Sequence, residues 1–344
     1  MQNMRKAKLR CYSYFLLLLF AFVSCRSKQA PAVSFYYWKT KFDLNQYENN
    51  ILAKNNVPVL YVRYFDIDVD PASGQAKSVS AITFDSTFTQ KTIIPVVYIK
   101  NRVFEKADSN GISTLSKNVF HLIASINEKT GMTASEVQFD CDWTEKTKDE
   151  FFLFLNHYRK ISGQKLSATI RLHQVKYSQR TGVPPVDEGV LMFYNMGAIS
   201  ASDVNSIYEE RNALKYISSL KHYPLPLDIA LPIFSWGIGT RNGKVQYLLN
   251  KMYVKDFEKD TNFVRLTDHR FKARHSFFKS GYYIMENDEI KVENVEEEEL
   301  SQMARMLKKN IPYPVKKIIF YDLDSSNLIN YDINIFQTVS EEFR

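Results

Sequence analysis

The alternation of apolar, strand-like runs with helical patterns constrains the fold of this 344-residue chain more than any other feature. Eight short runs rich in β-branched and aromatic residues recur along it, at Ser34–Lys39, Pro58–Phe65, Ile93–Ile99, Glu136–Trp143, Leu166–Leu172, Val190–Asn195, Asp228–Trp236 and Lys317–Leu323. Their nearly continuous apolar character is typical of strands that are covered on both faces. Eight such strands with mostly helical connections predict an α/β fold, a (β/α)8 TIM-like barrel.

The segments between these runs support the same architecture. Apolar residues recur at helical spacing in Ser116–Lys129 and Lys146–Lys160. Two further helices are expected, at Ser202–Leu220, which opens with a Ser/Asp start signal, and at Glu296–Lys309, which begins with acids and ends with lysines. The long stretch 253–295, between the last two strands, alternates in polarity and turns at Glu286–Glu289, which predicts a β-hairpin insertion. The rival fold is a doubly wound open sheet, but no glycine-rich phosphate loop follows any of the strands.

The N-terminus has the pattern of an export signal. A basic segment precedes the apolar run Tyr14–Val23, which is too short to span a bilayer, and Ser24-Cys25 follows. A small residue directly before a Cys resembles the lipobox of bacterial lipoproteins. We therefore expect a signal peptide over 1–24, lipidation (palmitate) at Cys25, a tether over 25–33 and a single barrel domain over 34–344. The alternatives are ordinary signal-peptidase cleavage or an uncleaved anchor.

Charge and cysteine content exclude several classes of function. The formal net charge is +7, but four basic residues lie in the predicted signal peptide, so the mature chain carries about +3. Without a basic stripe, we expect no nucleic acid partner. Cys141 is the one cysteine left after signal removal and lipidation, so the chain has no internal disulfide and no cysteine metal site. We expect no metal and no cofactor, and a location in the bacterial cell envelope, lipid-anchored to a membrane on its periplasmic or outer face.

Polar and aromatic side chains gather at the final positions of the strand-like runs. In a barrel of this type the carboxyl ends of the strands carry the functional site. The residues at these ends that we expect to contact a substrate are Trp38, Arg63, Arg171, His173, Gln174, Tyr194, Asn195, Trp236 and Asp322.

The fourth run holds the densest group of carboxylates. Because side chains alternate across a strand, Asp140 and Asp142 share one face, while Phe139 and Cys141 share the other. Two residues of strand advance about 6.6 Å, so the two carboxylates stand roughly that far apart. If they face the barrel interior they repel one another, and one of them keeps a raised pKa suited to proton donation. Alternatively, Asp142 is simply the N-cap of the following helix.

Three short motifs resemble the family 18 glycoside hydrolases, the chitinases and endo-N-acetylglucosaminidases. They are "FDCDWTE" (Phe139–Glu145), "MFYNMG" (Met192–Gly197) and "IIFYDLD" (Ile318–Asp324), at the fourth, sixth and last strands. The resemblance implies that Asp140 and Asp142 match the family's two aspartates and that Tyr194 holds the substrate's acetamido group. It also implies that Asn195 replaces the usual Asp. The family's catalytic Glu position is occupied by Thr144, and Glu145 comes one residue later.

This offset leaves three readings of the acid. Either the chain bulges so that Glu145 enters the cleft, or Asp142 serves as the acid, or the acid is missing. With Asp140, Asp142 and Glu145 as candidate catalytic residues, the first hypothesis is a membrane-tethered, exported glycoside hydrolase-like protein that acts on or binds a glycan. The alternative is a non-catalytic carbohydrate-binding barrel or a scaffold lipoprotein. The direction of the Glu145 carboxylate discriminates between them.

Overall fold

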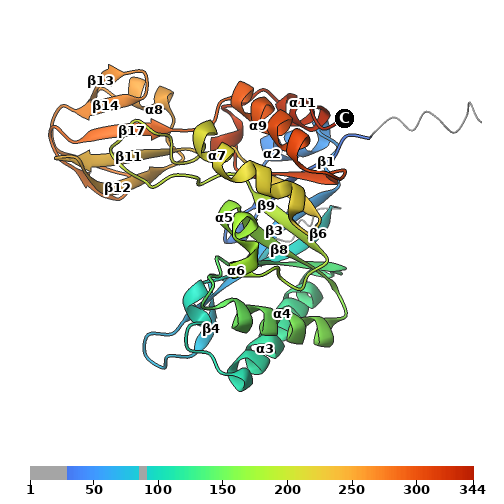
Figure 1. Ribbon diagram of the computed structural model, residues 1–344. Coiled ribbons are helices and arrows are strands. Elements are labelled where there is room, and N and C mark those ends of the chain that lie inside the picture. Colours follow the sequence, from blue (N-terminus) through green and yellow to red (C-terminus); the bar gives the residue numbers. More distant parts are fainter. Residues whose placement is uncertain (1–28, 85–90) are drawn as a thin grey trace, which may run out of the picture. The chain divides into compact units, whose positions relative to one another are not determined.

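The computed structural model describes residues 29–84 and 91–344, and the predicted signal peptide and Cys25 lie outside the described residues. Eight parallel strands of these ranges close into a barrel (Figure 1). They are β1 (Ala32–Tyr37), β3 (Val59–Val69), β6 (Thr92–Ile99), β7 (Glu136–Asp140), β8 (Lys165–Arg171), β9 (Glu188–Met192), β10 (Leu227–Pro232) and β18 (Lys317–Tyr321). Because β1 pairs with both β18 and β3, the ring is complete and the predicted (β/α)8 barrel is confirmed.

Helices follow most of the barrel strands. They are α2 (Gln46–Lys54), α3 (Ser109–Thr130), α4 (Lys148–Ser162), α5 (Leu172–Lys176), α6 (Ser178–Thr181), α7 (Glu210–Ile217), α9 (Glu297–Asn310), α10 (Ser325–Leu328) and α11 (Ile335–Glu341), with the 3-10 turns η1 (Asn101–Val103) and η2 (Ser218–His222). α3 begins earlier than its apolar pattern because Asp108 caps it, accepting from the Gly111 N–H at 2.7 Å. The helix predicted from Ser202 begins only at Glu210, and the residues before it form an irregular loop.

The insertion between the last two barrel strands is a sheet with its own small core. Its order is β12 (Lys244–Asn250), β11 (Trp236–Arg241), β17 (Glu289–Glu293), β14 (Arg270–Ala273) and β13 (Phe263–Thr267), all antiparallel, with α8 (Val254–Glu258) beside it. A hairpin of β15 (Phe277–Lys279) and β16 (Tyr282–Ile284) is separate. The insertion therefore starts at Trp236, before the expected stretch, and the strands flanking the predicted turn, β16 and β17, have different partners. Barrel and insertion belong to one compact unit, Pro31–Phe343.

Three short strands complete the described chain. β4 (Ala76–Val79) extends the barrel sheet antiparallel to the end of β3, and β2 (Lys41–Phe42) pairs with β5 (Thr83–Phe84). No helix in residues 29–84 and 91–344 is both long and apolar enough to cross a membrane.

The outward face of β7 anchors α4 against the barrel. Phe139 is fully buried and packs edge-on against Phe154 and Tyr158 of α4, with ring centroids 5.1 and 4.9 Å apart. Trp143 continues this face and stacks on Phe151 at 5.3 Å. Since side chains alternate along the strand, this packing turns Asp140 toward the barrel interior, as the sequence predicts.

Candidate functional site

Asp140 lies at the last position of β7, where its carboxyl group is 4% exposed. The Thr169 hydroxyl of β8 donates a hydrogen bond of 2.6 Å to one of its oxygens. Burial raises the pKa of Asp140 to about 6; the charge of Arg171 opposes this shift, and that of Asp142 adds to it. The buried carboxyl group therefore changes its protonation state at a pH of about 6.

Asp142 is held by an arginine of the next strand. Arg171 donates from Nε to one carboxylate oxygen of Asp142 and from Nη2 to the other, the latter at 3.1 Å. Burial alone would lower the pKa of Arg171, but Asp142 and Asp140 raise it, so the guanidinium remains charged. A two-point pair of this kind fixes both side chains, and both oxygens of Asp142 are engaged. Nη1 of Arg171 has no acceptor among the described residues.

Glu145 is paired with an arginine of α6. Its carboxylate accepts hydrogen bonds of 3.0 and 2.7 Å from Arg180 of α6, and the two side chains are 51% and 70% exposed. Thr144, which the resemblance aligns with the family's acid, forms a hydroxyl pair of 3.2 Å with Thr147. The Glu145 carboxylate is thus engaged by Arg180, and the residues that line the cavity beside Asp142 do not include it.

A cavity of about 470 Å³ opens beside the Asp142–Arg171 pair. It is lined by Asp142, Arg171, Leu172, His173, Tyr194, Asn195, Met196 and Tyr216. Tyr194 is 3% exposed, and its hydroxyl has no hydrogen-bond partner in the part of the chain that the structure describes. A buried hydroxyl without a partner is costly, so this atom is a candidate contact for a polar ligand group. Asn195 adopts a left-handed conformation, with φ of 55°, at the rim.

Aromatic rings form a continuous layer beneath and beside the cavity. Tyr321 of β18 stacks on Tyr194 at 5.7 Å and contacts Trp38, which follows β1, at 5.5 Å. Phe234, which follows β10, packs against Tyr194 at 5.8 Å and against Trp236 at 5.2 Å. The layer brings Trp38 and Trp236, both predicted as substrate contacts, into one aromatic cluster with Tyr194.

Two of the predicted substrate contacts, Arg63 and Gln174, make polar contacts within the protein. Arg63 donates to Asp66 at 2.6 Å and covers the Trp38 ring. Gln174 is fully buried, accepting from the Arg171 N–H at 2.8 Å and donating to the Trp143 carbonyl at 3.0 Å. Gln174 therefore fixes the backbone of the site, and the cavity lining does not include it.

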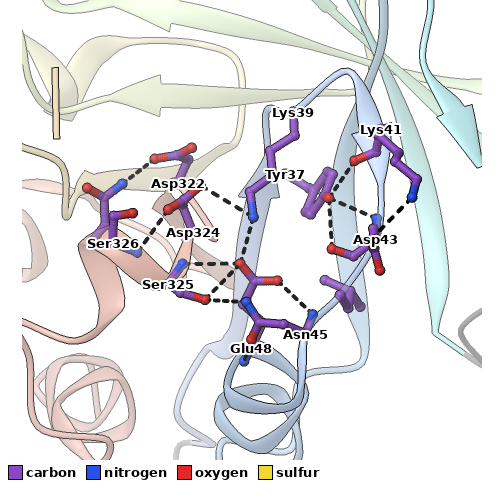
Figure 2. A network of polar contacts seen from close by, with 12 residues as sticks. Tyr37, Lys39, Lys41, Asp43, Asn45, Glu48, Asp322, Asp324, Ser325 and Ser326 are labelled. Carbon is purple, nitrogen blue, oxygen red and sulfur yellow. Dashed lines mark hydrogen bonds and ion pairs between the residues drawn. The ribbon is translucent and has the colours of Figure 1, made fainter. Parts of the chain in front are cut away.

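Asp322 belongs to a polar network at the seam between β1 and β18 (Figure 2). It accepts a hydrogen bond of 2.5 Å from Asn327, and burial raises its pKa to about 6. Nearby, Lys39 lies between Glu48 and Asp324, with nitrogen–oxygen distances of 2.7 and 3.3 Å. Glu48 is fully buried and also accepts from Ser325, so the network ties α2 to the end of β18. Asp322 thus belongs to a network that holds the fold together, and it is not among the residues that line the cavity.

The strand-end reasoning missed part of the cavity wall. Met196, which lies within the "MFYNMG" motif but is not among the expected contacts, lines it from the loop after β9. Tyr216 lines it from α7, where no strand-end pattern marks it. Tyr36 lies beneath, inside β1, and donates to Gln138 at 2.7 Å. No three His, Cys, Asp or Glu side chains in the described ranges form a group that could hold a metal ion.

Comparison with known proteins shows the class of fold. No protein-family model and no curated protein matches the sequence. The structural matches are barrels of the family 18 glycosidase type, so the fold that the three motifs imply is confirmed.

Three solved structures illustrate the likeness. The spore cortex-lytic enzyme SleL of Bacillus cereus is 15% identical, with a TM-score of 0.55 over 92% of this chain and 75% of that chain. A class V chitinase from Nicotiana tobaccum is 12% identical, with a TM-score of 0.50 over 92% and 99%. Human YKL-39, described as a pseudo-chitinase with retained chitooligosaccharide binding, is 10% identical, with a TM-score of 0.50 over 91% and 99%. At these identities the likeness establishes the fold alone.

Proposed function

We propose that the protein binds a glycan in the cavity at the carboxyl end of the barrel and does not hydrolyse it. One observation carries this proposal: the two candidate acids other than Asp140, which are Asp142 and Glu145, each form an ion pair with an arginine. Asp142 is held at both oxygens by Arg171, and Glu145 is paired with Arg180 through two exposed side chains. General acid catalysis of glycoside hydrolysis needs a carboxyl group within reach of the glycosidic oxygen, and neither side chain is available for it.

The cavity retains what a sugar-binding site needs. Ligand sites combine apolar walls with a few convergent polar groups, and sugars stack on aromatic rings through their apolar faces. Here the unpartnered Tyr194 hydroxyl and the spare Nη1 of Arg171 provide donors, and Tyr216 and Met196 provide apolar surface. The motif resemblance assigns Tyr194 to an acetamido group, which makes an N-acetylated sugar the first ligand to test. The pseudo-chitinase YKL-39 supports the proposal, because it shares this fold and is described as retaining chitooligosaccharide binding.

A second candidate function is hydrolysis with Asp140 as the proton donor. One observation favours it: the pKa of Asp140 is raised to about 6, in the range that a general acid requires near neutral pH. Asp140 is buried, accepts a hydrogen bond from Thr169 and is not among the residues that line the cavity. This arrangement supports binding over hydrolysis.

The experiment compares binding and turnover on the same ligands. Purified protein is titrated calorimetrically with a panel of neutral and N-acetylated oligosaccharides, and each mixture is then assayed for new reducing ends. We expect binding without product, weakened by Tyr194→Phe and unchanged by Glu145→Gln, the matched surface control. Product that disappears in Asp140→Asn would establish the hydrolase instead, and no binding to any member of the panel would defeat both functions.

The proposed location is the cell envelope, with the chain tethered to a membrane by a lipid on Cys25. The support is the sequence pattern of residues 1–25. Cys25→Ala is expected to abolish incorporation of labelled palmitate and to release the exported protein from the membrane fraction. Unchanged labelling in that variant would contradict the assignment.

A further inference from the structure

The loop between β9 and α7 forms one wall of the proposed glycan cavity. It starts at Asn195 and Met196, which line the cavity, and leads to α7, which adds Tyr216. Its residues 197–208 contain no helix or strand, and the hydrogen bond of 3.2 Å from the Gly197 N–H to the Ser206 carbonyl joins its two ends without fixing the residues between them. The conformation of the residues between these ends therefore depends on contacts made to other elements.

Two charged residues of β17, in the insertion, provide these contacts. Lys291 and Glu293 are 4% and 3% exposed and pair at 2.6 Å. The Lys291 ammonium donates to the carbonyl oxygens of Ser202 and Val204, at 2.5 and 3.0 Å. One oxygen of Glu293 accepts from the backbone N–H of Ser206 at 3.0 Å and also from the Ser206 hydroxyl.

The same carboxylate oxygen also holds an aromatic residue of the site. The indole N–H of Trp236 donates to Glu293 at 2.8 Å, and the Trp236 ring packs on Phe234 in the aromatic layer under the cavity. Glu293 thus binds the loop and the tryptophan at once. Arg270 of β14 and Asn205 add flanking contacts, from Arg270 to the Ala201 carbonyl at 2.7 Å and from Asn205 to the Asn294 carbonyl at 2.8 Å.

We propose that Glu293 and Lys291 are positioning residues that fix the 196–208 loop and Trp236, so that the cavity wall is formed before a ligand arrives. A buried ion pair whose remaining side-chain hydrogen bonds go to one loop and to Trp236 gives both a single arrangement, since removing either charge leaves its partner uncompensated. A preformed wall avoids the cost of ordering the loop on binding. The part of this inference that concerns affinity rests on the proposed glycan function.

The test first measures hydrogen exchange in the loop and then the affinity for the ligand. Hydrogen–deuterium exchange of the full chain is followed by mass spectrometry in wild type, Glu293→Ala and Glu293→Gln. The Gln variant keeps an acceptor for Trp236 and Ser206 but loses the charge. Asp288→Asn is the matched control, because Asp288 has a fully buried side chain in the same insertion and pairs with Arg241 at 2.7 Å. Its other side-chain hydrogen bonds come from Tyr247 and the Met285 N–H, which lie outside the loop.

We expect exchange in 196–208 to be about tenfold faster in Glu293→Ala, intermediate in Glu293→Gln, and unchanged in Asp288→Asn, with the barrel strands unaffected in all three. Glycan affinity should fall in the same order, by about tenfold in Glu293→Ala. Unchanged loop exchange in Glu293→Ala would overturn the inference, as would faster exchange with unaltered affinity. Equal effects of Asp288→Asn would show general loosening of the insertion and also overturn it. If wild type binds no glycan, the proposed function fails, while the exchange result still decides whether Glu293 holds the loop.

Discussion

Replacing Asp140 with Asn should make the stability difference between variant and wild type depend on pH. In the folded protein the pKa of Asp140 is about 6, mainly because of burial, against an ordinary value of 3.8. The difference is roughly 2 pH units, and each unit corresponds to about 1.4 kcal/mol, so the ionised carboxylate costs the folded state about 3 kcal/mol. Asn has no charge and still offers an oxygen to the Thr169 hydroxyl.

The direction of this pH dependence follows from whether the folded or the unfolded state binds the proton more tightly. Below about pH 4 the carboxyl group is protonated in both folded and unfolded states and contributes nothing. Between about pH 4 and 6 the folded state holds the proton more tightly, so wild type loses stability as pH rises, and above that the loss is complete. The free energy of unfolding of Asp140→Asn, minus that of wild type, should therefore increase by about 3 kcal/mol between pH 4 and pH 7.5. Asp322 titrates in a similar range but is present in both proteins, so its contribution cancels.

The assay is urea unfolding followed by circular dichroism at half-unit pH intervals, extrapolated linearly to water. Asp288→Asn provides a control of opposite sign. Burial would raise the pKa of Asp288, but the hydrogen bonds from Arg241 and the Met285 N–H lower it, so its contribution to stability is present above pH 4 and lost on acidification. The deficit of that variant should grow as pH rises through about 4. A pH-independent difference for Asp140→Asn would refute the burial argument.

Further changes test the packing and the site. Glu145→Gln should alter stability by less than about 1 kcal/mol in thermal unfolding, because the Arg180 pair is exposed; a larger loss would mean that Glu145 has a buried role. Tyr194→Phe should leave stability unchanged or slightly higher, since the hydroxyl has no partner, while weakening glycan binding about tenfold in calorimetry. Phe139→Ala should cost about 3–5 kcal/mol in urea unfolding, because it opens a cavity between β7 and α4; a loss below about 1 kcal/mol would contradict the packing.

Much of the barrel was predictable because its strands carry a local signal. Apolar runs of strand length mark all eight barrel strands, and alternation alone turned Asp140 inward and Phe139 outward. Three motifs, which lie at β7, β9 and β18, added the resemblance to barrels of the family 18 type. The periodicity of a segment can be read from its own sequence, so it requires no knowledge of the strands and helices against which the segment packs.

What depends on long-range contacts was not predictable. The run ending at Trp236 contains β10 and only the first residue of β11, and the break between them at residues 233–235 has no strong turn signal. Ser202 and Asp203 give a helix start signal, yet the Lys291 and Glu293 side chains bind the backbone of residues 202–206 instead. The direction of Glu145 likewise depends on Arg180, and the burial of Gln174 depends on Trp143 and the Arg171 backbone.

The most direct test of the central claim is one calorimetric titration of the full chain with a tetramer of N-acetylglucosamine, followed by product analysis of the same sample. The account predicts a saturable heat that Tyr194→Phe weakens, and an intact tetramer after prolonged incubation at pH 5 to 7. Shorter oligosaccharides formed by wild type but not by Asp140→Asn or Asp142→Asn would contradict it.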